Sequence, residues 1–88
     1  MVSKRVKVVN PQGMHMRPAQ LLVAEATKYD SAVTVIFGEK AINANSVIEL
    51  MASCIRRGSE IEIRCEGADE AEALAAAVRL LESGLGDL

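Results

Sequence analysis

Hydrophobic and polar residues alternate along two stretches of the chain, which is the period of a strand with one buried face, and a third stretch, residues 32–37, is rich in β-branched residues, which favour strands. The alternation is clearest where Ile61, Ile63 and Cys65 are separated by charged residues. A two-residue reversal that begins at Gly38 leads from this third stretch into a short fourth strand. The predicted strands cover residues 2–8, 32–37, 40–43 and 60–66.

Two long stretches place hydrophobic residues three and four positions apart, which is the spacing of an amphipathic helix. The first contains Pro18, which suits an opening helical turn because its missing N–H has no acceptor there. Its apolar positions are Ala19, Leu22, Val23 and Ala26. The second ends at Gly84, and its predicted buried stripe is Ala71, Leu74, Ala75, Val78 and Leu81.

Capping patterns mark the starts of two predicted helices. Ser46 and Glu49 have the spacing of a reciprocal capping box, in which the hydroxyl and the carboxylate each accept a backbone N–H. This pair predicts a short helix over residues 47–54. Asp69 and Glu72 repeat the spacing, so Asp69 is expected to cap the last helix.

The predicted order is therefore β-α-β-β-α-β-α. Short connections and one solvent-exposed face per strand favour a mostly antiparallel four-stranded sheet with three helices on one face, an α+β fold. The length of 88 residues suits a single domain spanning residues 1–88.

Composition narrows the classes of function. The net charge is −2, and one Tyr, one Phe and no Trp are present, which argues against a nucleic-acid binder. No apolar stretch has the length of a membrane span, so we expect no membrane insertion and a cytoplasmic location. Two cysteines are too few for a disulfide framework, and Cys65 is expected to be a buried small hydrophobe.

The chain's one histidine, His15, lies between Gly13 and the predicted start of a helix. A helix start offers amide N–H groups and a partial positive charge, and together these form an anion site. Arg17 adds a planar set of donors that suits phosphate oxygens. The positive helix end also disfavours the imidazolium form, so His15 is expected to be neutral, with a nitrogen lone pair available.

Residues 13–19, Gly-Met-His-Met-Arg-Pro-Ala, resemble the active-site signature of HPr, the histidine-containing phosphocarrier of the phosphoenolpyruvate-dependent sugar phosphotransferase system. The resemblance extends over essentially the whole chain, through residues 44–48, Gly58 and residues 67–70. It implies the open-faced β-sandwich of that family, which agrees with the predicted order of elements.

The resemblance also implies specific roles. His15 would be phosphorylated on Nδ1 by Enzyme I, using phosphoenolpyruvate, and would pass the group to a IIA domain for sugar uptake. Arg17 would hold the phosphate, and neither a metal nor another cofactor would be needed. The chain would act as a carrier with a phosphohistidine intermediate, not as a stand-alone enzyme. We expect a monomer, because a carrier must leave one partner for the next.

Two positions depart from the family pattern. Met16 stands where a small residue such as Thr, Ser or Ala is usual, and its bulk beside the phosphate predicts slower or partner-selective transfer. Gln12 stands where the shorter Asn or Asp is common, which leaves the capping of this turn open.

Ser46 has two interpretations. It is a structural cap, or it is a regulatory site phosphorylated by an HPr kinase/phosphorylase, which would weaken Enzyme I binding and enable a complex with a transcription regulator. Residues 44–48 also resemble the nitrogen-branch paralogue, NPr, in which this regulation is generally absent. The residues leave the choice between the sugar branch and the nitrogen branch open.

Partner binding is assigned to apolar residues beside the histidine. A helix as short as the second one cannot bury every hydrophobic side chain, although Ile48 and Met51 are equally open to a core role. The predicted partner-binding residues are Met16, Gln20, Leu21, Val47, Ile48 and Met51.

Two other functions compete with the carrier hypothesis. Met14, His15 and Met16 in a loop suit Cu(I), although Arg17 would repel the ion and the Cys-x-x-Cys pair of such carriers is missing. A purely regulatory relative that has lost carrier chemistry is the other alternative. Known relatives of that type replace the histidine, whereas this chain retains it.

Overall fold

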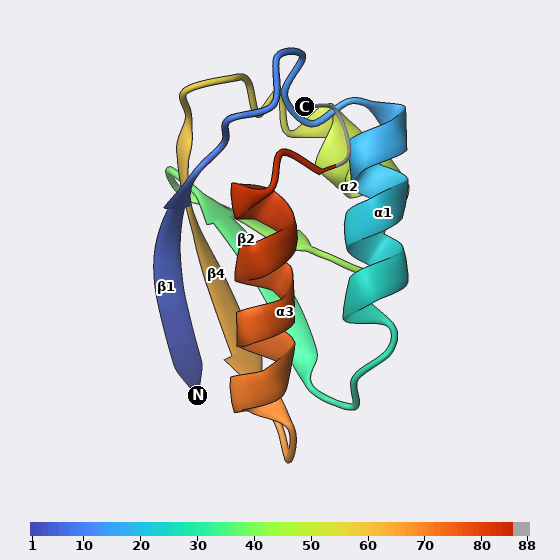
Figure 1. The fold of residues 1–88 in the computed structure, drawn as a ribbon, viewed down its shortest axis with the longest axis vertical. Helices are drawn as coiled ribbons and strands as arrows, with labels where there is room; N and C mark the ends of the chain where they lie inside the picture. The colour runs from blue at the N-terminus through green and yellow to red at the C-terminus, as the bar shows by residue number, and fades with distance from the viewer. Residues whose placement is uncertain (86–88) are drawn as a thin grey trace.

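A computed structural model describes residues 1–85, and these contain four strands and three helices in the predicted order (Figure 1). The strands are β1 (Val2–Lys7), β2 (Ala32–Phe37), β3 (Lys40–Asn43) and β4 (Glu60–Glu66). The helices are α1 (Met16–Ala26), α2 (Val47–Ala52) and α3 (Glu70–Glu82).

The strands form one sheet in the order β1-β4-β2-β3, and all neighbouring strands are antiparallel. β4 lies between β1 and β2, with Ile61 opposite Val6 and Ile63 opposite Val35. Helices α1 and α3 lie side by side against one face of the sheet (Figure 1). The predicted α+β fold with a mostly antiparallel sheet is confirmed.

The core lies between the sheet and the helices. Ile61, Ile63 and Cys65 of β4 are buried as their alternation predicts, and they pack with Leu22 of α1 and Leu81 of α3. Each fully buried leucine or isoleucine stabilises the fold by about 1.5–3 kcal/mol. Burial also raises the pKa of the Cys65 thiol, which keeps it protonated and consistent with a small core hydrophobe.

The buried face of α3 differs from the predicted stripe. Val78 and Leu81 are buried as expected, but Ala71 and Ala75 are exposed. The buried alanines of α3 are Ala73, Ala76 and Ala77 instead. The predicted buried face is partly wrong because many positions of α3 are alanine. The small alanine side chain gives little information about which face of a helix is buried.

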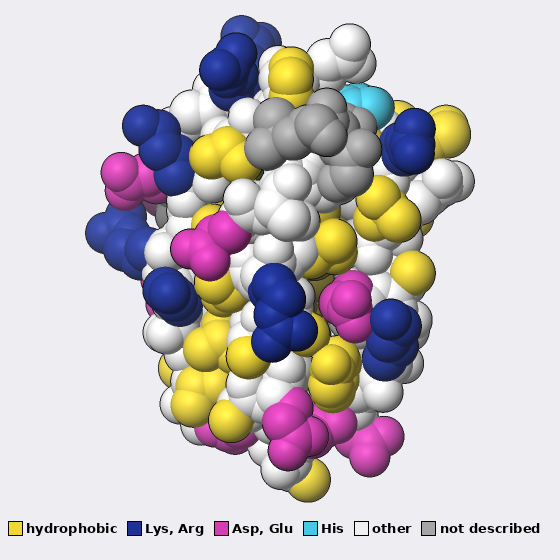
Figure 2. All heavy atoms as spheres, in the orientation of Figure 1, with side chains coloured by type: hydrophobic (Ala, Val, Ile, Leu, Met, Phe, Trp, Pro, Cys, Tyr) yellow, Lys and Arg dark blue, Asp and Glu magenta, His cyan; other side chains and the backbone are white. Residues whose placement is uncertain are grey.

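Charges are unevenly distributed along the molecule. On the face shown in Figure 2, acidic side chains gather at the lower end, where α3 begins, whereas basic side chains predominate at the upper left. The acidic end suits α3, because carboxylates are stabilised near the positive end of a helix.

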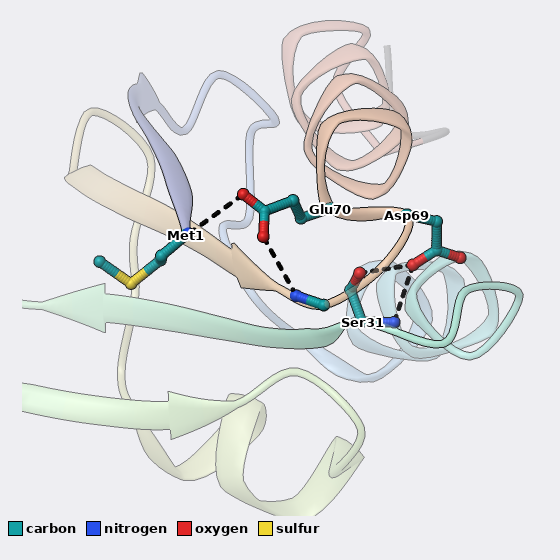
Figure 3. A network of polar contacts seen from close by, with 5 residues as sticks. Met1, Ser31, Asp69 and Glu70 are labelled. Atoms are coloured by element: carbon teal, nitrogen blue, oxygen red, sulfur yellow. Dashed lines mark hydrogen bonds and ion pairs between the residues drawn. The ribbon is translucent and has the colours of Figure 1, made fainter.

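Asp69, directly before α3, connects two loops instead of capping the helix. Its carboxylate accepts the amide N–H of Asp30 at 2.9 Å. It also accepts the amide N–H of Ser31, at 2.9 Å, and the Ser31 hydroxyl (Figure 3). The Ser31 hydroxyl is the main cause of a lowered pKa at Asp69. The predicted side-chain cap by Asp69 is therefore wrong, because loop residues far away in sequence bind this carboxylate.

In the predicted capping box, the carboxylate of Glu72 accepts a backbone N–H near the start of α3. In the structure, Glu70 accepts such an N–H instead. The Glu70 carboxylate accepts the Gly67 amide at 3.2 Å and forms an ion pair with the Met1 ammonium at 3.1 Å (Figure 3). The bond from Gly67 is the first cause of a lowered pKa at Glu70.

The start of α2 confirms half of its predicted capping box. The Ser46 hydroxyl accepts the Glu49 amide at 3.2 Å, as expected. The Glu49 carboxylate, however, accepts the amide of Asn43 at 3.3 Å, since the Ser46 amide already donates to the Asn43 carbonyl. The helix also ends two residues earlier than predicted, because Cys54 adopts a φ of +59° that no α-helix contains.

Within residues 1–85, no helix is long and apolar enough to cross a membrane.

Candidate functional site

His15 is the N-cap residue of α1. Its backbone is extended, with φ −89° and ψ −171°, and its carbonyl accepts the Ala19 amide at 3.0 Å. The side chain is half-buried at the end of the molecule where α1 begins. Within residues 1–85 the imidazole does not cap the helix, so it leaves the first amides of α1 to another acceptor. The predicted position of His15 at a helix start is confirmed.

The first turn of α1 is a positive environment. Its outward amides are those of Met16 and Arg17, because Pro18 has no N–H. This first turn contains no acidic residue, so no carboxylate of the turn itself reduces the partial positive charge of the helix start. Arg17 is exposed, and no carboxylate within residues 1–85 forms an ion pair with it. These groups suit an anion with several oxygens next to His15.

The turn before His15 packs closely against the loop that follows α2. The Met14 amide donates to the Ile55 carbonyl at 2.9 Å. Gly13 adopts a φ of +67°, and a Cβ added there would lie 2.7 Å from the Cα of Arg56 and against the Ile55 carbonyl oxygen. Only glycine fits this position, so the contact fixes the position of the turn relative to the loop that follows α2.

The three residues of the Cu(I) hypothesis do not share one environment. The Met14 side chain is 4% exposed and belongs to the hydrophobic core, whereas Met16 is 55% exposed. Among the residues described, no group of three or more His, Cys, Asp or Glu side chains is arranged to hold a metal. The separation of the two methionines does not favour the copper alternative.

An apolar patch lies on α1 and α2, which pack against each other. Apart from Met1, its members are the exposed large hydrophobic residues of the part of the chain that is described. Ile48 is 80% exposed, so its alternative as a core residue is wrong, and Met51 is also exposed. The apolar patch consists of Met16, Leu21, Ile48 and Met51.

Two other residues predicted to bind partners differ in exposure. Gln20 is exposed on α1 beside the apolar patch, whereas Val47 is half-buried and packs against the core. Ser46 is half-buried at the start of α2, where its hydroxyl is already an acceptor for Glu49.

The upper end of the molecule thus combines a histidine (Figure 2, cyan), a positive helix start, an arginine and an apolar patch. These features define a small α+β protein with a candidate anion site next to a histidine and exposed hydrophobic residues on the neighbouring helices.

Proteins with a similar sequence and fold include phosphocarriers. The family model for the PTS HPr component phosphorylation site matches residues 2–83. Phosphocarrier protein HPr of Treponema pallidum is 41% identical over 83 residues, which cover 94% of each chain. The HPr of Lysinibacillus sphaericus is also 41% identical, over 86 residues that cover 97% of this chain and 98% of the relative.

The fold comparison agrees. The crystal structure of HPr-C-His from Thermoanaerobacter tengcongensis has a TM-score of 0.95 and 35% identity, covering 100% of this chain and 99% of that one. The chain therefore belongs to the HPr family of phosphocarrier proteins of the phosphotransferase system. These relatives are named HPr, so the nitrogen-branch alternative is not favoured over the main interpretation.

Proposed function

We propose that His15 is the residue on which this phosphocarrier receives its phosphoryl group, from phospho-Enzyme I, and from which it passes the group to a IIA domain for sugar uptake. The observation that carries the proposal is the position of His15 as the N-cap of α1, beside the amides of Met16 and Arg17 in a first turn without acidic residues.

The chemistry needs one lone pair and several donors. In the accepting step, the Nδ1 lone pair of His15 attacks phosphorus, and the N–P bond forms as the donor's bond to phosphorus breaks. The proton of the neutral imidazole stays on the other ring nitrogen. The Arg17 guanidinium and the α1 amides bind the three phosphoryl oxygens. Transfer to the IIA domain reverses these bond changes, so the site must stabilise phosphohistidine without trapping it.

The apolar patch is the proposed docking surface for both partners. Weak, repeated binding suits a small apolar surface with an arginine next to it. The flexible side chains of Met16 and Met51 allow the same surface to fit more than one protein. We place this exchange in the cytoplasm, with the carrier acting as a monomer.

Regulation at Ser46 is a separate proposal. Phosphorylation by an HPr kinase/phosphorylase would add a strongly negative group beside the apolar patch and close to Glu49. We expect this group to weaken Enzyme I binding and to favour a transcription regulator instead. Mass spectrometry after incubation with the kinase and ATP tests this role, and an unmodified Ser46 would leave the residue as a helix cap only.

Labelling tests the role of His15. The chain is incubated with Enzyme I and radiolabelled phosphoenolpyruvate, together with His15→Ala and, as a matched control, Ser46→Ala. We expect an acid-labile, base-stable label on the parent and on Ser46→Ala and none on His15→Ala. Failure to label the parent with Enzyme I from several bacteria, or a label retained by His15→Ala, contradicts the proposal.

A further inference from the structure

The turn that leads to His15 contains a polar side chain with no exposure to solvent. Asn10 is fully buried, and its Nδ2 donates to the Gly13 carbonyl at 2.5 Å. We propose that Asn10 is a positioning residue for phosphoryl transfer, acting through this carbonyl on the backbone of His15. The inference rests on the proposed function of His15.

One carbonyl joins the two residues. The Gly13 oxygen accepts the Asn10 side chain and, at 3.1 Å, also the backbone amide of His15. A carbonyl has two lone pairs and can accept both bonds at once. The Gly13 amide in turn donates to the Asn10 carbonyl at 3.2 Å, which closes the turn on itself. The Asn10 side chain therefore fixes the peptide unit that sets the backbone of His15.

The opposite side of the turn is fixed as well. The Met14 amide binds the Ile55 carbonyl, and Gly13 has no room to move toward the backbone of Arg56. With the bonds on both sides of the turn in place, the turn is held in one position. The backbone of His15 therefore has one orientation at the start of α1. Without the Asn10 donor, this side of the turn keeps the backbone bond from Gly13 to Asn10 but loses the side-chain bond to the Gly13 carbonyl, and the imidazole loses its alignment with the incoming phosphoryl group.

A structural role alone predicts lower stability, whereas a positioning role predicts slower transfer at unchanged docking. Asn10→Ala removes the side chain, and Asn10→Asp keeps its shape but replaces the Nδ2 donor with an oxygen. Ser31→Ala is the matched control. Ser31 is also buried, and its hydroxyl binds Asp69 at the far end of the molecule (Figure 3).

The assay is single-turnover phosphorylation by phospho-Enzyme I over a range of carrier concentrations, below the unfolding temperature of every variant. For both Asn10 variants we expect the maximal rate to fall about tenfold, with a half-saturating concentration within about twofold of the parent. Ser31→Ala should transfer at the parent rate. The ¹⁵N spectrum of the His15 imidazole should change in the Asn10 variants and not in Ser31→Ala.

The outcomes separate the two proposals. A parent chain that is not phosphorylated overturns the proposed function itself. A phosphorylated parent whose Asn10 variants transfer equally fast overturns the positioning role only. The positioning role also fails if Ser31→Ala is slowed to the same extent, or if the Asn10 variants differ from the parent only in half-saturating concentration.

Discussion

Replacing Gly13 by alanine should reduce the free energy of unfolding far more than the same change at Gly38, a glycine with nearly the same backbone conformation. Gly13 and Gly38 have φ of +67° and +62°, so both substitutions require alanine in the left-handed region, at about 1–2 kcal/mol. No atom lies within 4 Å of a Cβ added to Gly38, whereas one added to Gly13 meets the backbone of Ile55 and Arg56. The difference between the variants therefore isolates the close approach of the two loops.

The magnitude follows from what must move. A Cβ 2.7 Å from the Arg56 Cα cannot be relieved by a side-chain rotation, because both neighbours are backbone. The turn must shift, and the bond from the Met14 amide to the Ile55 carbonyl is lost, at about 0.5–1.5 kcal/mol. With the left-handed cost and the strain of the shifted turn, Gly13→Ala should lose roughly 3–4 kcal/mol of unfolding free energy.

Urea and thermal unfolding measure this difference. Gly38→Ala should lose about 1–2 kcal/mol, the conformational cost alone. For a domain of this size a loss of 1 kcal/mol lowers the melting temperature by about 4–8 °C, so Gly13→Ala should melt roughly 12–32 °C below the parent. Equal losses for the two variants would refute the reasoning, because they would show that the contact with Ile55 and Arg56 carries no energy.

Three further predictions concern the proposed docking surface and the acidic end of the molecule. Met16→Thr should accelerate transfer from Enzyme I severalfold, because it removes bulk beside the phosphate; equal rates in single-turnover assays would refute this. Ile48→Asp should raise the half-saturating concentration of carrier about tenfold without loss of stability, whereas the exposed Ala71→Asp on α3 should not; equal effects would reject the apolar patch as the docking surface. Stability should fall in acid as Asp69 and Glu70 protonate: both have lowered folded-state pKa values, so their contribution is present above their unfolded values and is lost as pH falls through the folded ones. A urea midpoint that does not change on acidification would contradict the bonding shown in Figure 3.

Local patterns in the sequence predict most of the fold. The alternation around Ile61 and Ile63 defines β4 because every second residue must face the core. The orientation of α3 is wrong in the prediction because its alanines look alike on every face. Asp69 is misassigned for another reason: the residues that it binds lie 38 and 39 positions away, and no local spacing reveals them.

The candidate site divides in the same way. His15 and Arg17 are predictable because a turn glycine, a histidine and Arg-Pro at a helix start are neighbours in the sequence. The contact of Gly13 with Ile55 and Arg56 is not, since it joins two loops more than forty residues apart. The burial of the Asn10 side chain cannot be predicted from the sequence either, because Asn before Pro is typical of an ordinary exposed turn. Burial, not residue type, distinguishes Asn10 from such a turn residue.

The most direct test of the account follows one phosphoryl group through the chain. The parent is charged by Enzyme I and labelled phosphoenolpyruvate, purified away from the donor, and mixed with an unlabelled IIA domain. We predict that the label sits on His15, moves to the IIA domain and leaves an unmodified carrier that can be charged again. A label found on any other residue, or one that stays on the chain with every IIA domain tested, would contradict the central claim.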